Sequence, residues 1–309
     1  MNTSIYIITK PLQYINVTNI PDKNLKYLII INNFNDANEF YELVKSHSNL
    51  WIDIKIFDSK YFALSWLIIM NKRLKVSNIF LDSDYGIVLH FFLFFLKDKL
   101  ISVYEEGWGS YREIRTATNF ISFLKNKINV FFKNENIIGG SRFTTHIYLY
   151  HISFYKKTFN NNSKILLDFN FKFTQHIDSF KEFKYIFAQK EMSYLKNKEV
   201  LLYLTSYTYD LSIEDYLFEY KNNYKILKPH PHIKDFKGIT KFDEILNGVV
   251  PAEFIINSLL KIVEKLVIIH HGSTSLLYFL NNEKILEINI DKKTNKFYNS
   301  FTKYLKHSI

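Results

Sequence analysis

The sequence contains no cysteine. Disulfides and thiolate metal sites are therefore excluded, and a reducing compartment such as the cytoplasm is expected. Proline and glycine are also scarce, with 5 and 8 residues, and no stretch has the low-complexity composition of a linker. The segment Met1–Tyr14 lacks the basic start and long apolar core of a signal peptide, and it predicts the first strand of a fold.

Long apolar runs are missing as well. The most apolar stretch, YGIVLHFFLFFL at Tyr85–Leu96, is shorter than the roughly 20 residues that a helix needs to cross a bilayer, so it predicts a buried helix. The segment Phe120–Lys133 mixes aromatic residues with lysines. It predicts an amphipathic helix of the domain, and contact with a lipid surface is the alternative.

Acidic residues are outnumbered, with 30 against 40 basic ones, which gives a formal charge of +10. Such an excess favours polyanionic partners such as nucleic acid, anionic lipid or phosphorylated sugars. We find no nucleic-acid-binding module, zinc-finger spacing or arginine cluster, so nucleic acid is not an expected partner. A solvated lysine-rich surface and a membrane-surface role both remain open, since each lysine near an anionic leaflet contributes about 1 kcal/mol.

Short apolar runs typical of strands alternate with helix-like stretches along the whole chain. The predicted strands are Ser4–Thr9, Tyr27–Asn32, Ile52–Phe57, Asn78–Leu81, Leu100–Tyr104, Ile147–Tyr150 and Lys164–Leu167, then Val200–Leu204, Lys225–Leu227, Leu266–His270 and Lys284–Ile288. The predicted helices are Asp36–Ser46, Lys60–Asn71, Tyr85–Lys97, Asp210–Tyr220, Pro251–Glu264 and Ser273–Asn281. Nearly continuous apolar strands indicate parallel sheets covered on both faces. We therefore expect an α/β protein of two Rossmann-like domains, residues 1–190 and 191–309, facing a central cleft.

Ligands of parallel sheets bind beyond the carboxyl ends of the strands, so reactive side chains at those ends are candidates. In YEEG, Glu105, Glu106 and Gly107 follow a predicted strand. Glycine permits a tight turn, and a carboxylate presented there can act as a general base whose pKa its neighbour raises. A solvated charged turn is the alternative for so short a pattern.

Two strand ends in the second half could bind an anion. In KPHP, Pro231 restricts His230 to an extended conformation and Lys228 adds positive charge, which suits phosphate binding or proton donation; His232 is an alternative to His230. In HHGSTS, Gly272 precedes Ser273–Ser275, whose hydroxyls and free backbone N–H groups at a helix start could hold an anion. A rigid loop and a plain helix cap are the respective alternatives.

A fourth strand end carries DSD, with Asp82 and Asp84. This pair could coordinate a divalent metal that holds a sugar nucleotide. An acidic N-cap of the following helix is the preferred interpretation. Walker A, nucleophile-elbow, zincin and dinucleotide-binding patterns are absent from the sequence, which argues against those classes of enzyme.

Taken in order, the acid-acid-Gly triplet, the K-x-H-P segment and the Ser/Thr pair before a helix resemble bacterial sialyltransferases. The resemblance is to the lipooligosaccharide sialyltransferases (glycosyltransferase family 52) and the related capsule polysialyltransferases, and it covers three short motifs and the two-lobed length. It implies a GT-B arrangement with an acceptor-side first domain and a CMP-sugar-binding second domain. It also implies inversion by direct displacement, CMP-sialic acid as the donor, and no cofactor or metal.

The resemblance also assigns roles to residues. Glu106, beside Glu105, would be the base for the acceptor hydroxyl, with Asp210 in reserve. His230 would stabilise or protonate the departing CMP phosphate, which Ser273 and Thr274 would hold. The remaining residues expected to line the site are Gly107, Lys228, Pro231, Gly272 and Ser275.

The implied acceptor is a terminal sugar such as galactose on a lipid-linked bacterial surface glycan: lipooligosaccharide, O-antigen or capsule. Such an enzyme would be cytoplasmic and could rest on the inner face of the inner membrane; the oligomeric state stays open. Three alternatives remain: a transferase of Kdo from its CMP-activated form, a transferase acting on CDP-glycerol, and a non-catalytic glycan-binding protein of the same fold.

Overall fold

The computed structural model describes residues 2–113, 135–159, 163–187, 192–206, 209–231, 241–246, 249–290 and 296–307. The chain divides into two compact units, Met1–Asn33 with Ala37–His176 and Phe34–Asp36 with Ile177–Ile309. The boundary predicted at residue 190 falls inside the second unit. The segment after His176 belongs there because the Phe187 ring packs on Phe254 at 5.2 Å and Asn257 Nδ2 donates to Asp178 Oδ1 at 2.6 Å.

In the first unit, seven described strands form one sheet in the order β3-β2-β1-β4-β5-β6-β7, and all neighbours are parallel. The strands are β1 (Thr3–Ile8), β2 (Leu25–Ile31), β3 (Asp53–Phe57), β4 (Val76–Leu81), β5 (Leu100–Tyr104), β6 (Thr144–Leu149) and β7 (Ile165–Asp168). Every residue of β1 is buried. This matches the continuous apolar pattern of a central strand that is covered on both faces.

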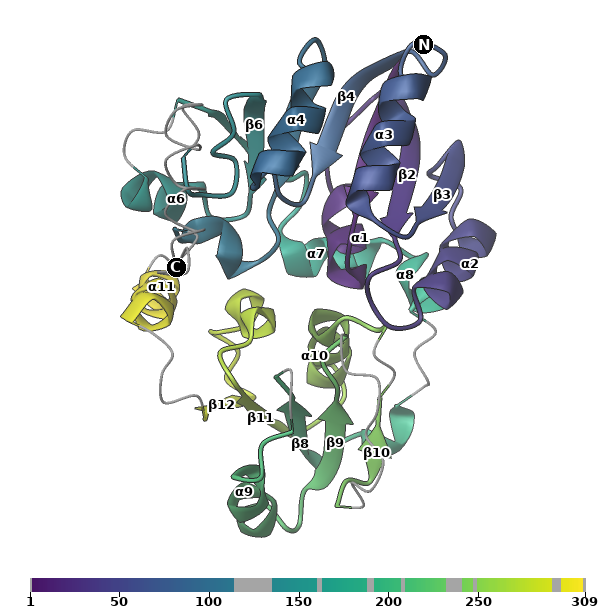
Figure 1. Ribbon diagram of the computed structural model, residues 1–309. Coiled ribbons are helices and arrows are strands. Elements are labelled where there is room, and N and C mark those ends of the chain that lie inside the picture. Colours follow the sequence, from purple (N-terminus) through teal and green to yellow (C-terminus); the bar gives the residue numbers. More distant parts are fainter. Residues whose placement is uncertain are drawn as a thin grey trace. The chain divides into compact units, whose positions relative to one another are not determined.

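Helices cover both faces of this sheet. They are α1 (Pro11–Thr18), α2 (Ala37–His47), α3 (Lys60–Met70), α4 (Ile87–Phe95), α6 (Ile152–Thr158) and the 3-10 helix η1 (Trp108–Tyr111). Helices α3 and α4 lie side by side on one face (Figure 1), where their buried leucines join Ile5 and Ile7 of β1 in one core. Tyr6 points to the other face and contacts Trp51, which packs on Tyr14 of α1.

Helix α4 corrects one expectation. The stretch Tyr85–Leu96 was predicted to be a buried helix, and Leu89 and Leu93 are indeed buried. Phe91 and Phe95, however, are 61% and 50% exposed, because only one side of α4 faces the sheet. No helix in the described part of the chain is long and apolar enough to cross a membrane.

In the second unit, five described strands form a parallel sheet in the order β10-β9-β8-β11-β12. They are β8 (Glu199–Leu204), β9 (Tyr224–Lys228), β10 (Glu244–Ile245), β11 (Lys265–His270) and β12 (Ile285–Asn289). The helices are α7 (Phe173–Ser179), which spans the division between the units, α8 (Phe183–Ile186), α9 (Ile213–Glu219), α10 (Ala252–Leu260), α11 (Lys296–His307) and the 3-10 helices η2 (Ser193–Leu195) and η3 (Thr274–Tyr278). Leu201, Leu227, Val267 and Ile269 form the core on one face.

The predicted α/β class, with two Rossmann-like parallel sheets, is confirmed by these strand pairings. The predicted helix Ser273–Asn281 is wrong: only the short 3-10 helix η3 forms there. The segment Phe120–Lys133 and the alternative residue His232 lie outside the described residues.

Candidate active site

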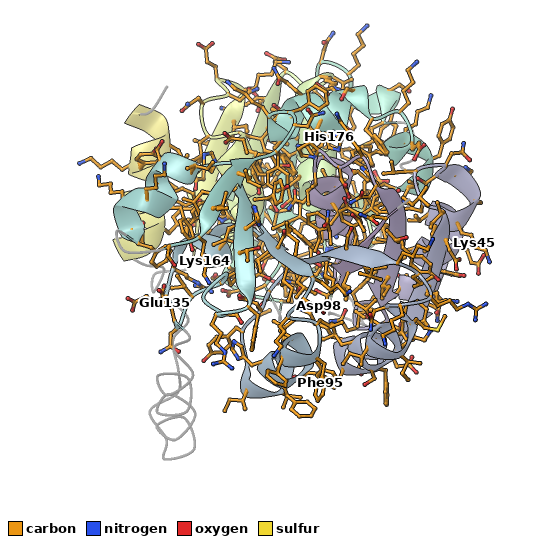
Figure 2. All side chains as sticks on the ribbon, turned by 90° about the horizontal axis from the view of Figure 1, so that it is seen from above. Lys45, Phe95, Asp98, Glu135, Lys164 and His176 are labelled. Carbon is orange, nitrogen blue, oxygen red and sulfur yellow. The ribbon has the colours of Figure 1, made fainter. Side chains whose placement is uncertain are left out.

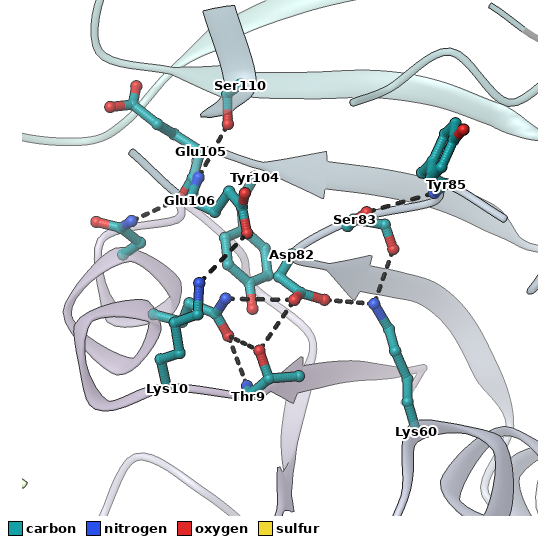
Figure 3. Close-up of polar contacts among 12 residues, drawn as sticks. Thr9, Lys10, Lys60, Asp82, Ser83, Tyr85, Tyr104, Glu105, Glu106 and Ser110 are labelled. Atoms are coloured by element: carbon teal, nitrogen blue, oxygen red, sulfur yellow. Dashed lines mark hydrogen bonds and ion pairs between the residues drawn. The ribbon is translucent and has the colours of Figure 1, made fainter. Parts of the chain in front are cut away.

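The first sheet reverses its strand order at β1, which has β2 on one side and β4 on the other. In open parallel sheets such a switch point is where ligands bind, beyond the carboxyl ends of the strands. Three chain segments end there: Thr9 and Lys10 follow β1, Asp82 follows β4, and Glu105 and Glu106 follow β5. The side chains of Thr9, Lys10, Asp82 and Glu106 form one polar cluster, which Lys60 and Gln13 join (Figure 3).

Glu106 is the member of this cluster that is suited to proton transfer. Its side chain is 24% exposed, and Oε2 lies 3.8 Å from Lys10 Nζ. Burial raises the pKa of Glu106, the charge of Asp82 raises it further, and the charges of Lys10, Lys60 and Arg112 lower it. A carboxylate of this kind accepts a proton nearer to neutral pH than an ordinary glutamate does.

The backbone holds Glu106 in place. Gly107 has φ +106°, a conformation that only glycine adopts readily, so the predicted tight turn is confirmed. The turn leads into η1, and Ser110 Oγ accepts the Glu106 N–H at 3.0 Å. A Cβ on Gly109 would lie 2.6 Å from Glu106 Oε1, so the glycine leaves room for the carboxylate.

Asp82 anchors the centre of the cluster and is 6% exposed. It pairs with Lys60, whose Nζ also donates to Ser83 O at 2.8 Å, and it accepts from Thr9 Oγ1 at 3.0 Å and Gln13 Nε2 at 3.3 Å. Burial alone would raise its pKa, but the charge and hydrogen bond of Lys60, together with the Lys10 charge and the Thr9 hydrogen bond, outweigh burial and hold the pKa below the usual value. Asp82 is therefore a fixed negative charge.

Glu105 turns away from Glu106 (Figure 3), as successive residues at the end of a strand do. It is 1% exposed, and its Oε2 accepts from the Tyr111 hydroxyl and from the Tyr150 N–H at 2.8 Å. Its backbone carbonyl accepts from Asn16 Nδ2 at 2.7 Å. These bonds fix the end of β5 against α1 and β6, which suits Glu105 to positioning rather than to proton transfer.

Asp84 does not cap the following helix, so the preferred interpretation of DSD is wrong. The N-cap of α4 is Gly86, with no side-chain bond. Asp84 is fully buried and accepts from Gly139 N, Ser141 N and Thr144 Oγ1 at 2.8, 2.9 and 2.6 Å. Asp82 and Asp84 thus bind different partners, and no group of three or more His, Asp or Glu side chains suited to a metal occurs among the described residues.

In the second unit, His230 follows β9 and is half-buried, as is Pro231. The His230 N–H donates to Thr205 Oγ1, beyond β8, at 2.9 Å. Lys228 is 3% exposed and its Nζ donates to Pro229 O at 2.8 Å; burial lowers its pKa to about 7. A buried, weakly charged amine of this kind braces the turn and is poorly suited to the predicted phosphate contact.

His270, the last residue of β11, fixes the loop that follows this strand. Its Nδ1 accepts the Ser273 N–H at 2.8 Å and its Nε2 lies 3.2 Å from Glu287 Oε1, which assigns the ring proton to Nε2. The Gly272 N–H donates to Asn289 Oδ1 at 3.2 Å. The Ser273 hydroxyl caps η3 by accepting from Ser275 N at 3.3 Å. Ser275 is buried, while Ser273 and Thr274 are half-buried.

Asp210 lies near this loop, with Oδ2 3.9 Å from His271 Nδ1 and a side chain 41% exposed. Its Oδ1 accepts from Ser212 N at 2.9 Å, at the start of α9. That bond is the main cause of a lowered pKa, with a smaller effect from His271. A carboxylate with a lowered pKa is a weaker base than Glu106.

Sequence reasoning missed Thr9, Lys10, Gln13 and Lys60 as members of the first unit's cluster. Thr9 and Lys10 could have been found, because they follow the first predicted strand and the rule for strand ends applies to them equally. Gln13 and Lys60 lie inside helices, and their convergence on Asp82 comes from packing alone.

No protein-family model matches the chain, and a search of curated proteins found no match. Among solved structures, the wall teichoic acid polymerase TagF has a TM-score of 0.49 at 11% identity, covering 93% of this chain and 69% of that chain. The E. coli heptosyltransferase WaaC with ADP has a TM-score of 0.37 at 9% identity, covering 99% and 100%. At these values the likeness carries no argument about activity.

Proposed function

We propose that the chain is an inverting glycosyltransferase of GT-B type that moves sialic acid from CMP-sialic acid to a sugar hydroxyl of a bacterial surface glycan without a metal. The observation that carries the proposal is Glu106: a partly exposed carboxylate at the switch point of a parallel sheet, with a pKa raised by burial. The sialyl donor and the galactose-type acceptor rest on the motif resemblance.

In the proposed reaction, Glu106 removes the proton of the acceptor hydroxyl. The oxygen attacks the anomeric carbon of the donor from the side opposite CMP, and the bond from that carbon to the phosphate oxygen breaks with its electron pair. One displacement of this kind inverts the anomeric centre. Lys10 and Lys60 keep Glu106 from becoming too basic, since both of their charges lower its pKa.

The second unit is proposed to bind the donor. Its support is the rigidity of two strand ends: Thr205 fixes the His230 backbone, and His270 and Asn289 fix the loop that carries Ser273 and Thr274. His230 would donate a proton or a hydrogen bond to the departing phosphate. Lys228 is assigned no contact with the donor, because its amine is buried.

The test combines a donor panel with matched variants. Wild-type protein is expected to release CMP from CMP-sialic acid in the presence of a galactose-terminated acceptor. Glu106→Gln should lower kcat by about 10²–10⁴ while CMP binding stays unchanged, as expected for loss of a general base. Glu42→Gln, at an exposed position on α2, is the matched control and should keep wild-type activity.

Other outcomes discriminate the alternatives. Turnover of CDP-glycerol or CMP-Kdo but not of CMP-sialic acid would refute the sialyl donor. Loss of activity in Asp210→Asn or Glu105→Gln, with Glu106→Gln active, would move the base to that residue. A wild-type protein that turns over no donor would refute the proposal that the chain is an enzyme and would favour a glycan-binding protein.

A further inference from the structure

The outer side of α3 and α4 carries large apolar side chains that nothing in the described chain covers. Six of them are between 43% and 78% exposed: Phe62, Ile69, Val88, Phe91, Phe94 and Phe95. We call these six residues the α3–α4 face. Figure 2 shows Phe95 at the periphery of the first unit, pointing away from the sheet.

The α3–α4 face is continuous. The two helices lie side by side (Figure 1) and share one buried core beneath them, with Leu64 and Leu67 from α3 and Leu93 from α4. Rings bridge the surface as well, since Tyr61 stacks on Phe92 at 5.9 Å. The exposed side chains therefore form a single patch, and patches of this kind on soluble proteins mark interaction sites.

The apolar composition of α4 is not that of a helix with one side in water. Helix α4 reads IVLHFFLFF and has no charged residue. A helix that is apolar on all sides is ordinarily covered on all sides, yet the sheet covers only the side that carries Leu89 and Leu93. The outer side thus suits an apolar environment that the described part of the chain does not provide.

The rim of the face is basic. Lys72, Arg73 and Lys75 are exposed in the turn after α3, and Lys97 is exposed after α4, followed by half-buried Lys99. Between residues 59 and 104 the only exposed acidic residue is Asp98, because Asp82 and Asp84 are buried. Lys97 Nζ lies 4.6 Å from the Phe94 ring, so cation and aromatic group belong to one surface.

We propose that the α3–α4 face binds the surface of an anionic lipid bilayer. Its aromatic side chains would enter the boundary between head groups and acyl chains, while the basic rim would meet lipid phosphates, which is how interfacial helices bind. The basic rim would be attracted to an anionic bilayer, whereas the rims of two copies of this face would repel each other. The charge therefore favours lipid over a second copy of the chain. The proposal does not depend on the proposed activity.

The basic rim and the candidate site lie at opposite ends of α3. Lys60 begins the helix and reaches Asp82, whereas Lys72 and Lys75 follow its last turn.

Sedimentation of the full chain with lipid vesicles tests the proposal. Vesicles of phosphatidylcholine containing phosphatidylglycerol should bind the wild-type protein, and vesicles of phosphatidylcholine alone should bind it more weakly. Phe91→Ser with Phe95→Ser should weaken binding about tenfold or more, because two aromatic groups no longer leave water. Phe218→Ser, at a 77% exposed position of α9, is the matched control and should bind as wild type.

A charge pair provides a second arm. Lys72→Glu should weaken binding to the anionic vesicles about fivefold or more, from about 1 kcal/mol for each basic group near the surface. Lys45→Glu on α2, which lies apart from α4 (Figure 2), should have little effect. Circular dichroism of each variant checks that the fold is kept.

Three results would overturn the proposal. The first is a wild-type protein that does not sediment with anionic vesicles. The second is equal binding by wild type, the double phenylalanine variant and Lys72→Glu. The third is a wild-type dimer that Phe91→Ser with Phe95→Ser dissociates while vesicle binding is unchanged, which would assign the face to a second copy of the chain.

Discussion

At Glu106, two effects of opposite sign act on one carboxylate. Burial favours the protonated acid, whereas Lys10 favours the carboxylate, and the balance leaves the pKa raised. The Lys10–Glu106 distance of 3.8 Å makes Lys10 a positioning and tuning residue, with no contact to substrate required of it.

Replacing Lys10 by methionine should therefore raise the pKa of Glu106 further. A general base works only when it is unprotonated, so the loss of kcat/KM on the acidic side should move to higher pH. Pre-steady-state or steady-state rates measured across pH in wild type, Lys10→Met and the exposed control Lys45→Met check this shift. An unchanged profile in Lys10→Met would show that another group sets the acidic side.

At the same scale, the sequence could identify Glu106 but not its surroundings. Its position after an apolar strand and before a glycine is a local pattern. The charges of Lys10 and Asp82 reach it only because β1 and β4 are neighbours in the sheet and β5 lies next to β4, so they come from residues far apart in the chain. Local sequence carries no signal for that proximity.

At the scale of elements, Asp84 joins the end of β4 to the start of β6 and the segment before it through three hydrogen bonds. Two of the donors are backbone N–H groups, which exist at nearly every residue, so the sequence cannot indicate that they are the partners. This is why a helix cap was the natural, and wrong, interpretation of the DSD pattern.

Asp84→Ala should destabilise the first unit by about 3 kcal/mol, because buried donors lose their acceptor. We expect the melting temperature of the chain's first transition to fall by roughly 5–10 °C. Asp98→Ala is the control, since Asp98 is 65% exposed and pairs with Lys99 at the surface. Equal melting temperatures for the two variants would contradict the role given to Asp84.

The strands were more predictable than the helices, for a physical reason. Buried parallel strands are continuous apolar runs, and each predicted run corresponds to a strand. β10 was missed because it has only two residues, Glu244 and Ile245. Helix α1 was missed because Gln13, Tyr14, Ile15, Asn16 and Val17 are all buried, which removes the polar face that marks an amphipathic helix.

At the scale of the whole molecule, the two sheets followed from the sequence but their boundary did not. The helix-like stretch before β8 does not differ in amino-acid composition from the segments around it, so composition does not mark a boundary there. Its place in the second unit comes from contacts such as Phe187 on Phe254. The α3–α4 face also escaped prediction, because an apolar run does not say how much of a helix its neighbours cover.

Activity of the whole protein is expected to survive EDTA and to gain nothing from added magnesium or manganese. The reason is that the two aspartates best placed by sequence are already engaged, Asp82 by Lys60 and Asp84 by backbone donors. Transfer rates before and after chelation check this expectation. Loss of activity that magnesium restores would show that a metal takes part.

The central position of β1 has a consequence for how the chain is made. β1 pairs on one edge with β2, the next strand along the chain, and on its other edge with β4, where Thr3 lies opposite Val76. The partner for that second edge is therefore synthesised more than 60 residues later than β1. Until then a strand that is wholly buried in the folded protein has an open edge, which is the kind of surface on which nascent chains associate with one another. Synthesis of this protein should therefore depend on how quickly β4 follows, and slow translation between the two strands should favour aggregation over folding.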